Sequence, residues 1–340
     1  MLAVYITKPG KPEVVQIRET DRPALKAGQV MVKVKATGLN YAEIVVRRGL
    51  YPDAPKFPFI SGYEYSGIVE DDNNCGIFQK GDRVLGVAMF GAQAQYIAAN
   101  PLQLFKIPDS MSFDLAAALP VNYLTAYYAL VRFAGLRDNE TVLIHSCAGG
   151  VGTAASQLAK ERNAVVFGTT SSDDKVKYLE NIGIDYPVNY RQSDYSRKVD
   201  EITNGKGVDI VLDPVGGPNF RKSFKLLKSG GRIVSYGVAD LTAGGRFNLP
   251  RLIWKFLTIP SVRTLNLIQS NRGVYGLALN RLLDNADEVG MVIKELLGKF
   301  ENGSIKPVIS RVFDFKEVAS AHEFLESGKS TGKIVLNFED

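Results

Sequence analysis

The sequence predicts an α/β protein in which a doubly wound parallel sheet is joined to a second domain rich in β-strands. Short segments of alternating apolar and polar residues, separated by glycine and proline turns, fill residues 1–118, a pattern typical of a barrel or sandwich. Over residues 119–264, strand-like and helix-like segments alternate, which indicates parallel strands covered by helices on both faces. The length of 340 residues suits two domains of ordinary size.

The β-rich domain is expected to contain short strands divided by turns such as Lys80-Gly81-Asp82. The expected strands are Leu2–Thr7, Val14–Arg18, Gln29–Ala36, Tyr63–Glu70, Arg83–Ala88 and Gln95–Ala99. The last part of the chain predicts a helix over 287–302, a strand over 310–314, a helix over 315–326 and a strand over 333–338. Because this part is too small for a third domain, we expect residues 265–340 to complete the first one.

The second domain, residues 119–264, is expected to begin its alternation with the strand Thr141–His145 and a helix over 151–162. Further along, the predicted strands are Val165–Thr169, Tyr186–Asn189, Val208–Asp213 and Arg232–Gly237, with a helix over 174–181. Such a run of strand, helix and strand units is typical of a parallel sheet.

A glycine-rich turn follows the first of these strands, with the sequence His145-Ser146-Cys147-Ala148-Gly149-Gly150-Val151-Gly152. Aligned with the dinucleotide-binding pattern G-x-G-x-x-G, Cys147 takes the first glycine position, Gly149 the second and Gly152 the third. Without a Cβ, Gly149 lets the backbone approach a pyrophosphate, and Gly152 lets the helix pack closely on the sheet. Free N–H groups at the start of the helix favour an anion. A tight turn without a ligand is the alternative.

The end of the second strand favours NADPH over NADH. An NAD-specific site usually has an acidic residue there to bind the ribose 2′-hydroxyl. Here the hydroxyl residues 169–172 come first and Lys175 follows, which suits a 2′-phosphate better. Asp173 and Asp174 either cap the next helix or disfavour the phosphate. The loops 213–217 and 235–238 follow later strands and are expected at the same edge of the sheet.

The sequence offers few ligands for a metal ion. A catalytic zinc needs about three nitrogen, sulfur or oxygen ligands. The histidines and cysteines are His145, His322, Cys75 and Cys147. His145 and Cys147 belong to the glycine-rich turn, and His322 is expected on the surface of a late helix. We therefore expect chemistry without a metal, which suits the reduction of an electrophilic acceptor better than the oxidation of an alcohol.

Charge and hydropathy limit the possible partners. The net charge is +5, but the basic residues are scattered and do not form a nucleic-acid-binding pattern. The apolar stretch Leu249–Ile268 contains Arg251, Lys255, Pro260 and Arg263, which argues against a membrane span. This stretch either belongs to the core, with one edge facing the second chain of a dimer, or forms a surface for a protein or lipid partner. The N-terminus has no signal-peptide pattern, so we expect a cytoplasmic location.

Several motifs resemble the zinc-independent quinone oxidoreductase branch of the medium-chain dehydrogenase/reductases. They are the segments 38–43 (Gly-Leu-Asn-Tyr-Ala-Glu), 48–52 (Arg-Gly-Leu-Tyr-Pro), 61–67, 148–152, 187–190 and 213–217. Tyr63 stands where zinc-dependent relatives have a histidine ligand, and no cysteine lies near Asn40. Residues 247–279 and 302–307 resemble most the vesicle amine transport protein-like subgroup.

This resemblance implies a GroES-like first domain, a Rossmann second domain and a homodimer that pairs the edge strands of its Rossmann sheets. It implies that Asn40 and Thr125 lie near the nicotinamide and that Tyr51 and Tyr63 line the substrate site. The remaining implied cofactor contacts are Ala148, Gly149, Gly150, Val151 and Gly152 at the pyrophosphate, Ser171, Lys175 and Tyr190 at the 2′-phosphate, and Val215, Tyr236, Gly237 and Val238 along the cofactor. Relatives often have alanine in place of Cys147, so its thiol is a candidate for oxidation.

The expected activity is hydride transfer from NADPH to a quinone or a related conjugated carbonyl. Negative charge develops on the acceptor oxygen and needs a hydrogen-bond donor, for which Asn40 and Tyr51 are the candidates. Tyr51 or water then supplies the proton. A 2-alkenal or enoyl reductase is one alternative, because only the acceptor pocket would differ. An NADPH-binding module that acts through a protein or lipid partner is another.

Overall fold

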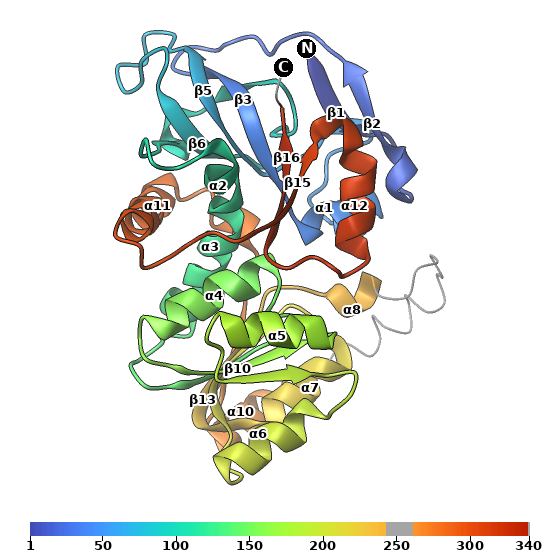
Figure 1. Cartoon of the computed structure of the whole chain (residues 1–340), viewed down its shortest axis with the longest axis vertical. Coiled ribbons are helices and arrows are strands. Elements are labelled where there is room, and N and C mark those ends of the chain that lie inside the picture. The colour runs from blue at the N-terminus through green and yellow to red at the C-terminus, as the bar shows by residue number, and fades with distance from the viewer. Residues whose placement is uncertain (243–260, 339–340) are drawn as a thin grey trace. The chain divides into compact units, whose positions relative to one another are not determined.

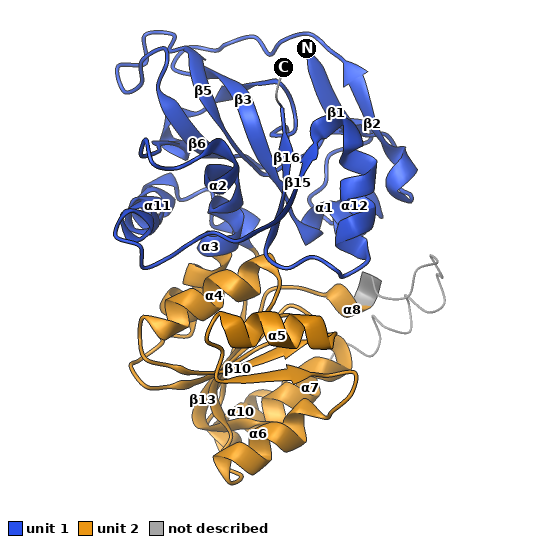
Figure 2. Ribbon diagram, viewed as in Figure 1, with its two compact units in different colours: residues 1–124, 279–340 blue, residues 125–278 orange. Residues whose placement is uncertain are grey.

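The computed structural model describes residues 1–242 and 261–338. Two compact units make up the chain: Met1–Leu124 with Leu279–Asp340, and Thr125–Ala278 (Figure 2). The return to the first unit comes after Ala278, whereas the sequence placed it after residue 264. The later boundary has a structural reason, because strand β14 (Gly273–Gly276) pairs in parallel with β13 (Leu227–Ser235) in the sheet of the second unit.

The first unit, unit 1, contains two sheets. The smaller has the order β2-β1-β4, with β1 (Leu2–Ile6), β2 (Val15–Glu19) and β4 (Phe59–Ile60). The larger has the order β15-β16-β3-β5-β6-β8, and β7 (Tyr96–Ala99) also pairs with β3. Its strands are β3 (Val30–Leu39), β5 (Glu64–Asp71), β6 (Arg83–Val87), β8 (Leu104–Lys106), β15 (Ile309–Asp314) and β16 (Lys333–Asn337). Alternate residues of β3, including Val30, Val32 and Val34, pack into one apolar core, as period-2 patterning predicts.

Helices in unit 1 lie beside these sheets (Figure 1). They are α1 (Tyr41–Arg47), α2 (Phe113–Ala118), α11 (Ala286–Glu301) and α12 (Val318–Glu326), and α3 (Pro120–Tyr127) crosses the boundary between the units. Single 3-10 turns occur at η1 (Pro12–Val14), η2 (Pro101–Gln103), η4 (Leu279–Arg281) and η5 (Phe315–Glu317).

The expectation that His322 lies on the surface was wrong. His322 is fully buried, because residues 318, 321 and 322 form the inner face of α12. Among the described residues neither ring nitrogen has a hydrogen-bond partner. Burial, together with the nearby positive charge of Arg47, lowers the pKa of His322 to about 3.

The second unit, unit 2, is a six-stranded parallel sheet with the order β11-β10-β9-β12-β13-β14. Its other strands are β9 (Thr141–Ile144), β10 (Val165–Thr170), β11 (Tyr186–Asn189) and β12 (Val208–Asp213). Helices α4 (Gly150–Lys160) and α5 (Asp173–Asn181) cover one face, and α6 (Tyr195–Thr203) and α7 (Gly217–Lys225) cover the other (Figure 1). The short helices α8 (Ala239–Thr242) and α10 (Thr264–Ser270) and the π-helical turn η3 (Tyr128–Phe133) also belong to this unit. The sequence therefore predicted the α/β class with a doubly wound parallel sheet and a β-rich domain correctly.

Candidate functional site

The carboxyl edge of the unit 2 sheet gathers most of the residues that the sequence singled out. Successive parallel strands all end at this edge, so the loops that follow β9 to β13 lie next to one another. These loops, together with the first turns of the helices that follow them, contain Ala148, Gly149, Gly150, Val151, Gly152, Ser171, Lys175, Tyr190, Val215, Tyr236, Gly237 and Val238. Thr125 also belongs to unit 2, where it is nearly buried.

The glycine-rich turn after β9 has the geometry that its sequence requires. A Cβ on Gly152 would come within 2.5 Å of the backbone oxygens of Ser146 and Cys147, so only glycine fits there without a shift. Gly149 is the N-cap of α4, and no side chain caps the helix at this position. The first N–H groups of α4 are therefore available to an anion at this end of the sheet.

Cys147 is an interior residue of this turn. Its side chain is fully buried, and its Sγ lies 3.2 Å from the Ser156 hydroxyl. Burial raises the pKa of the thiol to about 12. A buried, protonated thiol is a poor nucleophile, so this environment does not favour the oxidation that the sequence analysis considered.

Ser172 is the N-cap of α5 and accepts a hydrogen bond from Lys175 N. The aspartates next to it were candidates for this role, but Asp173 and Asp174 occupy the first turn of the helix instead. Asp173 accepts from Asn189 Nδ2 at 2.8 Å and from Gln192 Nε2 at 2.7 Å. Burial, with a smaller effect of the nearby Arg191, lowers the pKa of Lys175.

The loops after β12 and β13 contact each other. Asp213 Oδ1 accepts from the backbone N–H groups of Val215 and Gly216, and Tyr236 N donates to Asp213 O. A Cβ on Gly237 would come within 2.5 Å of Pro214 O, so these two turns need a glycine at their contact. Val238, at the end of this segment, is 46% exposed.

A buried polar network supports the turn from inside unit 2. His145 Nδ1 lies 2.9 Å from Thr169 Oγ1, and His145 Nε2 lies 2.7 Å from Ser223 Oγ. Burial lowers the pKa of His145 to about 4, so the ring is neutral at physiological pH. His145 therefore joins β9, β10 and α7 below the glycine-rich turn.

A second polar cluster lies in unit 1, where Asn40 follows β3. Asn40 Nδ2 donates to Glu64 Oε1 at 2.9 Å, and Lys333 Nζ donates to Asn40 Oδ1 at 2.5 Å. Lys333 also forms a buried ion pair with Glu64. Both ends of the Asn40 amide are therefore fixed. Within the described part of the chain one N–H of Nδ2 has no partner, so it remains for another acceptor.

Glu43 extends this cluster. Its Oε2 accepts from Asn40 N at 2.7 Å, and Gln93 Nε2 lies 3.4 Å from its Oε1. Burial raises the pKa of Glu43 to about 8, against the lowering effect of Lys333. The carboxyl is therefore protonated at neutral pH and can act as a hydrogen-bond donor. Gln93 Oε1 has no partner among the described residues. If the Gln93 amide is flipped so that its oxygen and nitrogen exchange places, Oε1 can accept from the Glu43 carboxyl.

Tyr51 and Tyr63 belong to one apolar cluster of unit 1. Its buried members include Ile6, Val46 and Phe59, and the Tyr63 ring lies 5.1 Å from that of Phe90. Burial raises the pKa of both tyrosines. The charge of Asp53 adds to the effect on Tyr51, and Glu43 adds to the effect on both once its carboxyl ionises at higher pH. The structure thus brings Tyr51 and Tyr63 together, with Glu43 close enough to affect both.

Sequence reasoning missed Glu64, Lys333 and Gln93. Lys333 is 293 residues from Asn40, so no local pattern connects them. A signal was present at Gly38, because a Cβ there would meet Lys333 Cε, Glu64 Oε1 and Ala117 O at 2.4 to 2.6 Å. A glycine inside a strand often marks such a close approach.

The described residues contain no group of three or more His, Cys, Asp or Glu placed to hold a metal ion. Each of the two histidines and two cysteines is either buried or hydrogen-bonded to another group. Cys75 Sγ accepts from Phe78 N in a surface turn, and Cys147 and His145 have the partners given above.

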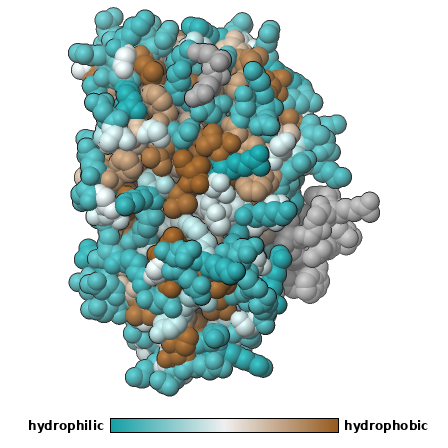
Figure 3. All heavy atoms as spheres, viewed as in Figure 1, coloured by the Kyte–Doolittle hydropathy of each residue, from teal (hydrophilic) through white to brown (hydrophobic). Residues whose placement is uncertain are grey.

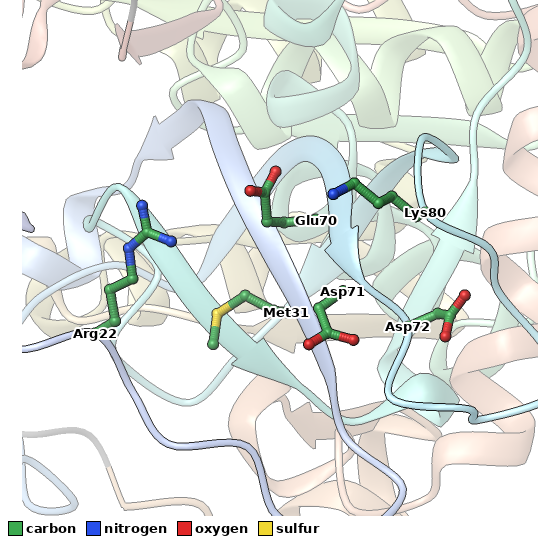
Figure 4. A pocket seen from close by; sticks show the side chains of 6 residues that line it. All are labelled: Arg22, Met31, Glu70, Asp71, Asp72 and Lys80. Carbon is green, nitrogen blue, oxygen red and sulfur yellow. The ribbon is translucent and has the colours of Figure 1, made fainter.

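A separate cavity of about 500 Å³ lies in unit 1 (Figure 4). Its lining includes Met31 near the start of β3 and Glu70 and Asp71 at the end of β5. Asn40 follows the other end of β3, so this cavity is about 30 Å away from it along the strand. We assign it no role in the chemistry of the site.

Two family descriptions match the chain: an alcohol dehydrogenase GroES-like domain over residues 26–109 and a zinc-binding dehydrogenase domain over residues 182–336. A synaptic vesicle membrane protein VAT-1 homolog of Danio rerio is 39% identical over 340 residues, which cover 99% of this chain and 70% of that protein. The chain belongs to the medium-chain dehydrogenase/reductase family.

Within the medium-chain dehydrogenase/reductases, the chain falls in the quinone oxidoreductase-like group that includes the VAT-1 homologues. Human quinone oxidoreductase is 30% identical over 340 residues, which cover 99% of this chain and 97% of that enzyme. The crystal structure of Escherichia coli quinone oxidoreductase complexed with NADPH superposes with a TM-score of 0.87 at 29% identity, over 99% of this chain and 100% of that one.

The relationship to quinone oxidoreductases supports an oxidoreductase of the medium-chain dehydrogenase/reductase kind. None of the helices in the described ranges is long and apolar enough to cross a membrane. On the face drawn in Figure 3, hydrophilic side chains are interspersed with separate apolar patches on each unit.

Proposed function

We propose that this protein reduces quinones or related conjugated carbonyls with NADPH, without a metal ion. The observation that carries the proposal is the Asn40 amide, which Glu64 and Lys333 hold at both ends while one N–H remains. A donor held in this way needs no reorganisation when charge develops on an acceptor oxygen. The relationship to quinone oxidoreductases supports the choice of acceptor.

The residues of unit 2 fit a dinucleotide. The uncapped start of α4 and the glycines of the turn suit a pyrophosphate, and Ser171, Lys175 and Tyr190 suit a 2′-phosphate. The cofactor would extend along Val215, Tyr236, Gly237 and Val238. Its nicotinamide would lie near Thr125 and Asn40. The bound NADPH would supply the hydride.

The residues of unit 1 account for the rest of the reaction. Tyr51 and Tyr63, with their apolar neighbours, provide a partly dry surface for a flat acceptor. Burial keeps both hydroxyls protonated at neutral pH, so each can act as a donor. In this proposal the remaining N–H of Asn40 stabilises the developing oxyanion, and Tyr51 or water supplies the proton.

The donor set argues for chemistry without zinc. Tyr63 stands where zinc-dependent relatives are expected to have a histidine ligand, and no cysteine lies near Asn40, where their cysteine ligand is expected. A phenol is a poor substitute for a histidine ligand of zinc. The Asn40 oxygen, which is the atom of the amide that could bind a metal, already accepts a hydrogen bond from Lys333. Metal analysis of the active protein tests this point, since full activity without bound zinc is expected.

The deciding experiment follows NADPH oxidation with a 1,4-benzoquinone and an α,β-unsaturated carbonyl side by side. NADH is the cofactor control, and reactions without enzyme correct for direct reduction of the quinone. We expect saturable turnover of the quinone that prefers NADPH. Faster turnover of the enone would make the protein a 2-alkenal or enoyl reductase instead.

A second candidate function is an NADPH-binding module that acts through a protein or lipid partner. The name of its VAT-1 relatives, synaptic vesicle membrane proteins, favours it. In the stretch Leu249–Ile268, residues 249–260 lie outside the described part, but Leu265 and Ile268 on α10 are each 69% exposed. Tight NADPH binding without turnover of either acceptor, together with co-sedimentation with vesicles, would favour this function. We also propose that the protein is a cytoplasmic homodimer and that it does not bind nucleic acid.

A further inference from the structure

A chain of hydrogen-bonded side chains crosses the interior of unit 2 and ends at the loop after β12. Its members are Thr169 on β10, His145 directly after β9, Tyr195 on α6, Ser223 and Asn219 on α7, and Asp213 at the end of β12. The strands β10, β9 and β12 are neighbours in the sheet. This hydrogen-bond chain therefore connects three strand ends at the edge where we propose that the cofactor binds.

The direction of each hydrogen bond follows from the Asp213 end. Asp213 Oδ1 accepts from the backbone N–H groups of Val215 and Gly216. The Asn219 atom that lies 3.1 Å from this acceptor is therefore the donor Nδ2 and not the oxygen. Asn219 Oδ1 then faces Tyr195, whose hydroxyl donates to it at 2.8 Å. Burial raises the pKa of Tyr195 to about 12, so this hydroxyl is protonated at neutral pH.

Each hydroxyl has a single proton to donate, which fixes the remaining directions. The Tyr195 proton is used on Asn219, so the Ser223 hydroxyl, 3.2 Å from the Tyr195 oxygen, donates to Tyr195. The Ser223 proton is then used as well, so His145 Nε2, which lies 2.7 Å from Ser223 Oγ, is the donor of that pair. The neutral His145 ring has only one N–H, and its Nδ1 therefore accepts from the Thr169 hydroxyl at 2.9 Å.

All five hydrogen bonds between these side chains thus point toward Asp213. Hydrogen bonds that point the same way along a chain polarise and strengthen one another. Asp213 Oδ2 is buried and has no partner among the described residues, so the carboxylate depends on the donors at Oδ1. The backbone N–H groups of Val215 and Gly216 bind the same oxygen, and the position of Asp213 therefore sets the conformation of the loop 213–217.

We propose that Tyr195 is a positioning residue for the loop 213–217, along which the proposed function places the cofactor. Its hydroxyl orients the Asn219 amide so that Nδ2 faces Asp213. The role of the loop rests on the proposed NADPH function, but the direction of the hydrogen-bond chain does not. Without the hydroxyl, the Asn219 amide loses the hydrogen bond that holds it in this orientation, and the Asp213 carboxylate is held less firmly.

Tyr195→Phe tests this role, because it removes the hydroxyl and keeps the ring that packs on His145. Calorimetry compares NADPH, which in the proposed function contacts the loop 213–217, with ADP, which occupies the glycine-rich turn. We expect NADPH to bind about fivefold more weakly and ADP to bind as before. Tyr178→Phe on α5 is the matched control: it removes a buried hydroxyl that has no partner in the described part of unit 2 and should change neither ligand.

The direction of the hydrogen-bond chain has a test of its own, in the nitrogen chemical shifts of the histidine rings. The protein has two histidines, and the signals that remain in His145→Asn belong to His322. We expect the Nε2–H tautomer of His145 in the wild type. In Tyr195→Phe the Ser223 hydroxyl loses its acceptor and can donate to His145 Nε2 instead, so the Nδ1–H tautomer should appear. Tyr178→Phe should leave the tautomer unchanged, as would a Tyr195 side chain that only fills space.

The outcomes separate this inference from the proposed function. The Nδ1–H tautomer of His145 in the wild type, or a tautomer that Tyr195→Phe does not change, would overturn the hydrogen-bond chain. Unchanged NADPH binding in Tyr195→Phe, or an equal loss of ADP binding, would overturn the positioning role. A wild-type protein that does not bind NADPH would refute the proposed function and with it the role of the loop, whereas the change of tautomer would still establish the direction of the chain.

Discussion

The side-chain amide of Asn40 is fixed in orientation, because Glu64 and Lys333 form hydrogen bonds to its opposite ends. We predict that Asn40→Ala lowers kcat for quinone reduction about 100-fold, the usual cost of removing one donor to an oxyanion. Steady-state kinetics provide the measurement, and the KM for NADPH serves as the internal control. Unchanged turnover in this variant would show that the assigned role is wrong.

Glu43 links stability to pH. Its pKa is about 8 in the folded protein, above the ordinary value of 4.5, so the folded state retains a proton that the unfolded state has lost. Its contribution is fully present below about pH 4.5 and is lost as the pH rises through 8. We predict that Glu43→Gln, which stays neutral, reduces the fall in unfolding free energy between pH 5 and 9, as measured in urea. An equally steep fall in the variant would contradict this.

At the scale of elements, two glycines of the glycine-rich turn are expected to have different roles, one in the stability of the fold and the other in cofactor binding. A Cβ on Gly152 would lie 2.5 Å from two backbone oxygens, whereas one on Gly149 would lie 3.2 Å from Ser146 O and faces the proposed pyrophosphate. We predict that Gly152→Ala costs about 1–3 kcal/mol of stability, as overpacking usually does. Gly149→Ala should leave the melting temperature nearly unchanged and weaken ADP about tenfold. Thermal melts and calorimetry distinguish the two, and similar losses of stability would refute the assignment.

Element prediction succeeded where the periodicity was strong. The strands β11 and β12 have the bounds that the sequence predicted. Strand β12 is fully buried and mostly apolar, and the turn residues 214–217 follow it, which makes its end easy to place. Helices α6 and α7 went unnoticed. In α6 only Tyr195 and Val199 are buried, and α7 begins with Gly-Pro-Asn, residues that favour turns over helices. Strand β14 was missed for a similar reason, since glycines stand at both of its ends.

Over the whole molecule, the sequence predicted that the loops of unit 2 gather at one edge of the sheet, but it did not predict the cluster around Asn40. The loops of unit 2 follow consecutive strands, and a parallel sheet gathers such loops at one edge whatever their side chains. The Asn40 cluster depends on contacts across 24 to 293 residues. Only the three-dimensional pairing of β16 with β3 brings Lys333 to Asn40, and no local rule contains that information.

The proposed dimer is also a property of the whole molecule. β14 pairs only with β13 among the described strands, and the exposed Leu265 and Ile268 precede it in the chain. We predict that the wild-type protein has twice the mass of one chain in light scattering. Replacing Leu265 and Ile268 by lysine should give a monomer, whereas Met291→Lys, on the exposed side of α11 in unit 1, should not. A wild-type monomer would refute the dimer.

Unit 1 is built from both ends of the chain, and unit 2 is a continuous insertion in it. On the ribosome, unit 2 can therefore fold while unit 1 still lacks β15 and β16. Lys333 is synthesised 269 residues after Glu64, and until then neither the Glu64 carboxylate nor the Asn40 oxygen has this lysine as a partner. A nascent chain would thus acquire its proposed cofactor site before its proposed catalytic amide is held in place. A chain that stops before β16 would keep the residues of the proposed cofactor site in unit 2 but would lose the lysine that fixes the proposed catalytic amide.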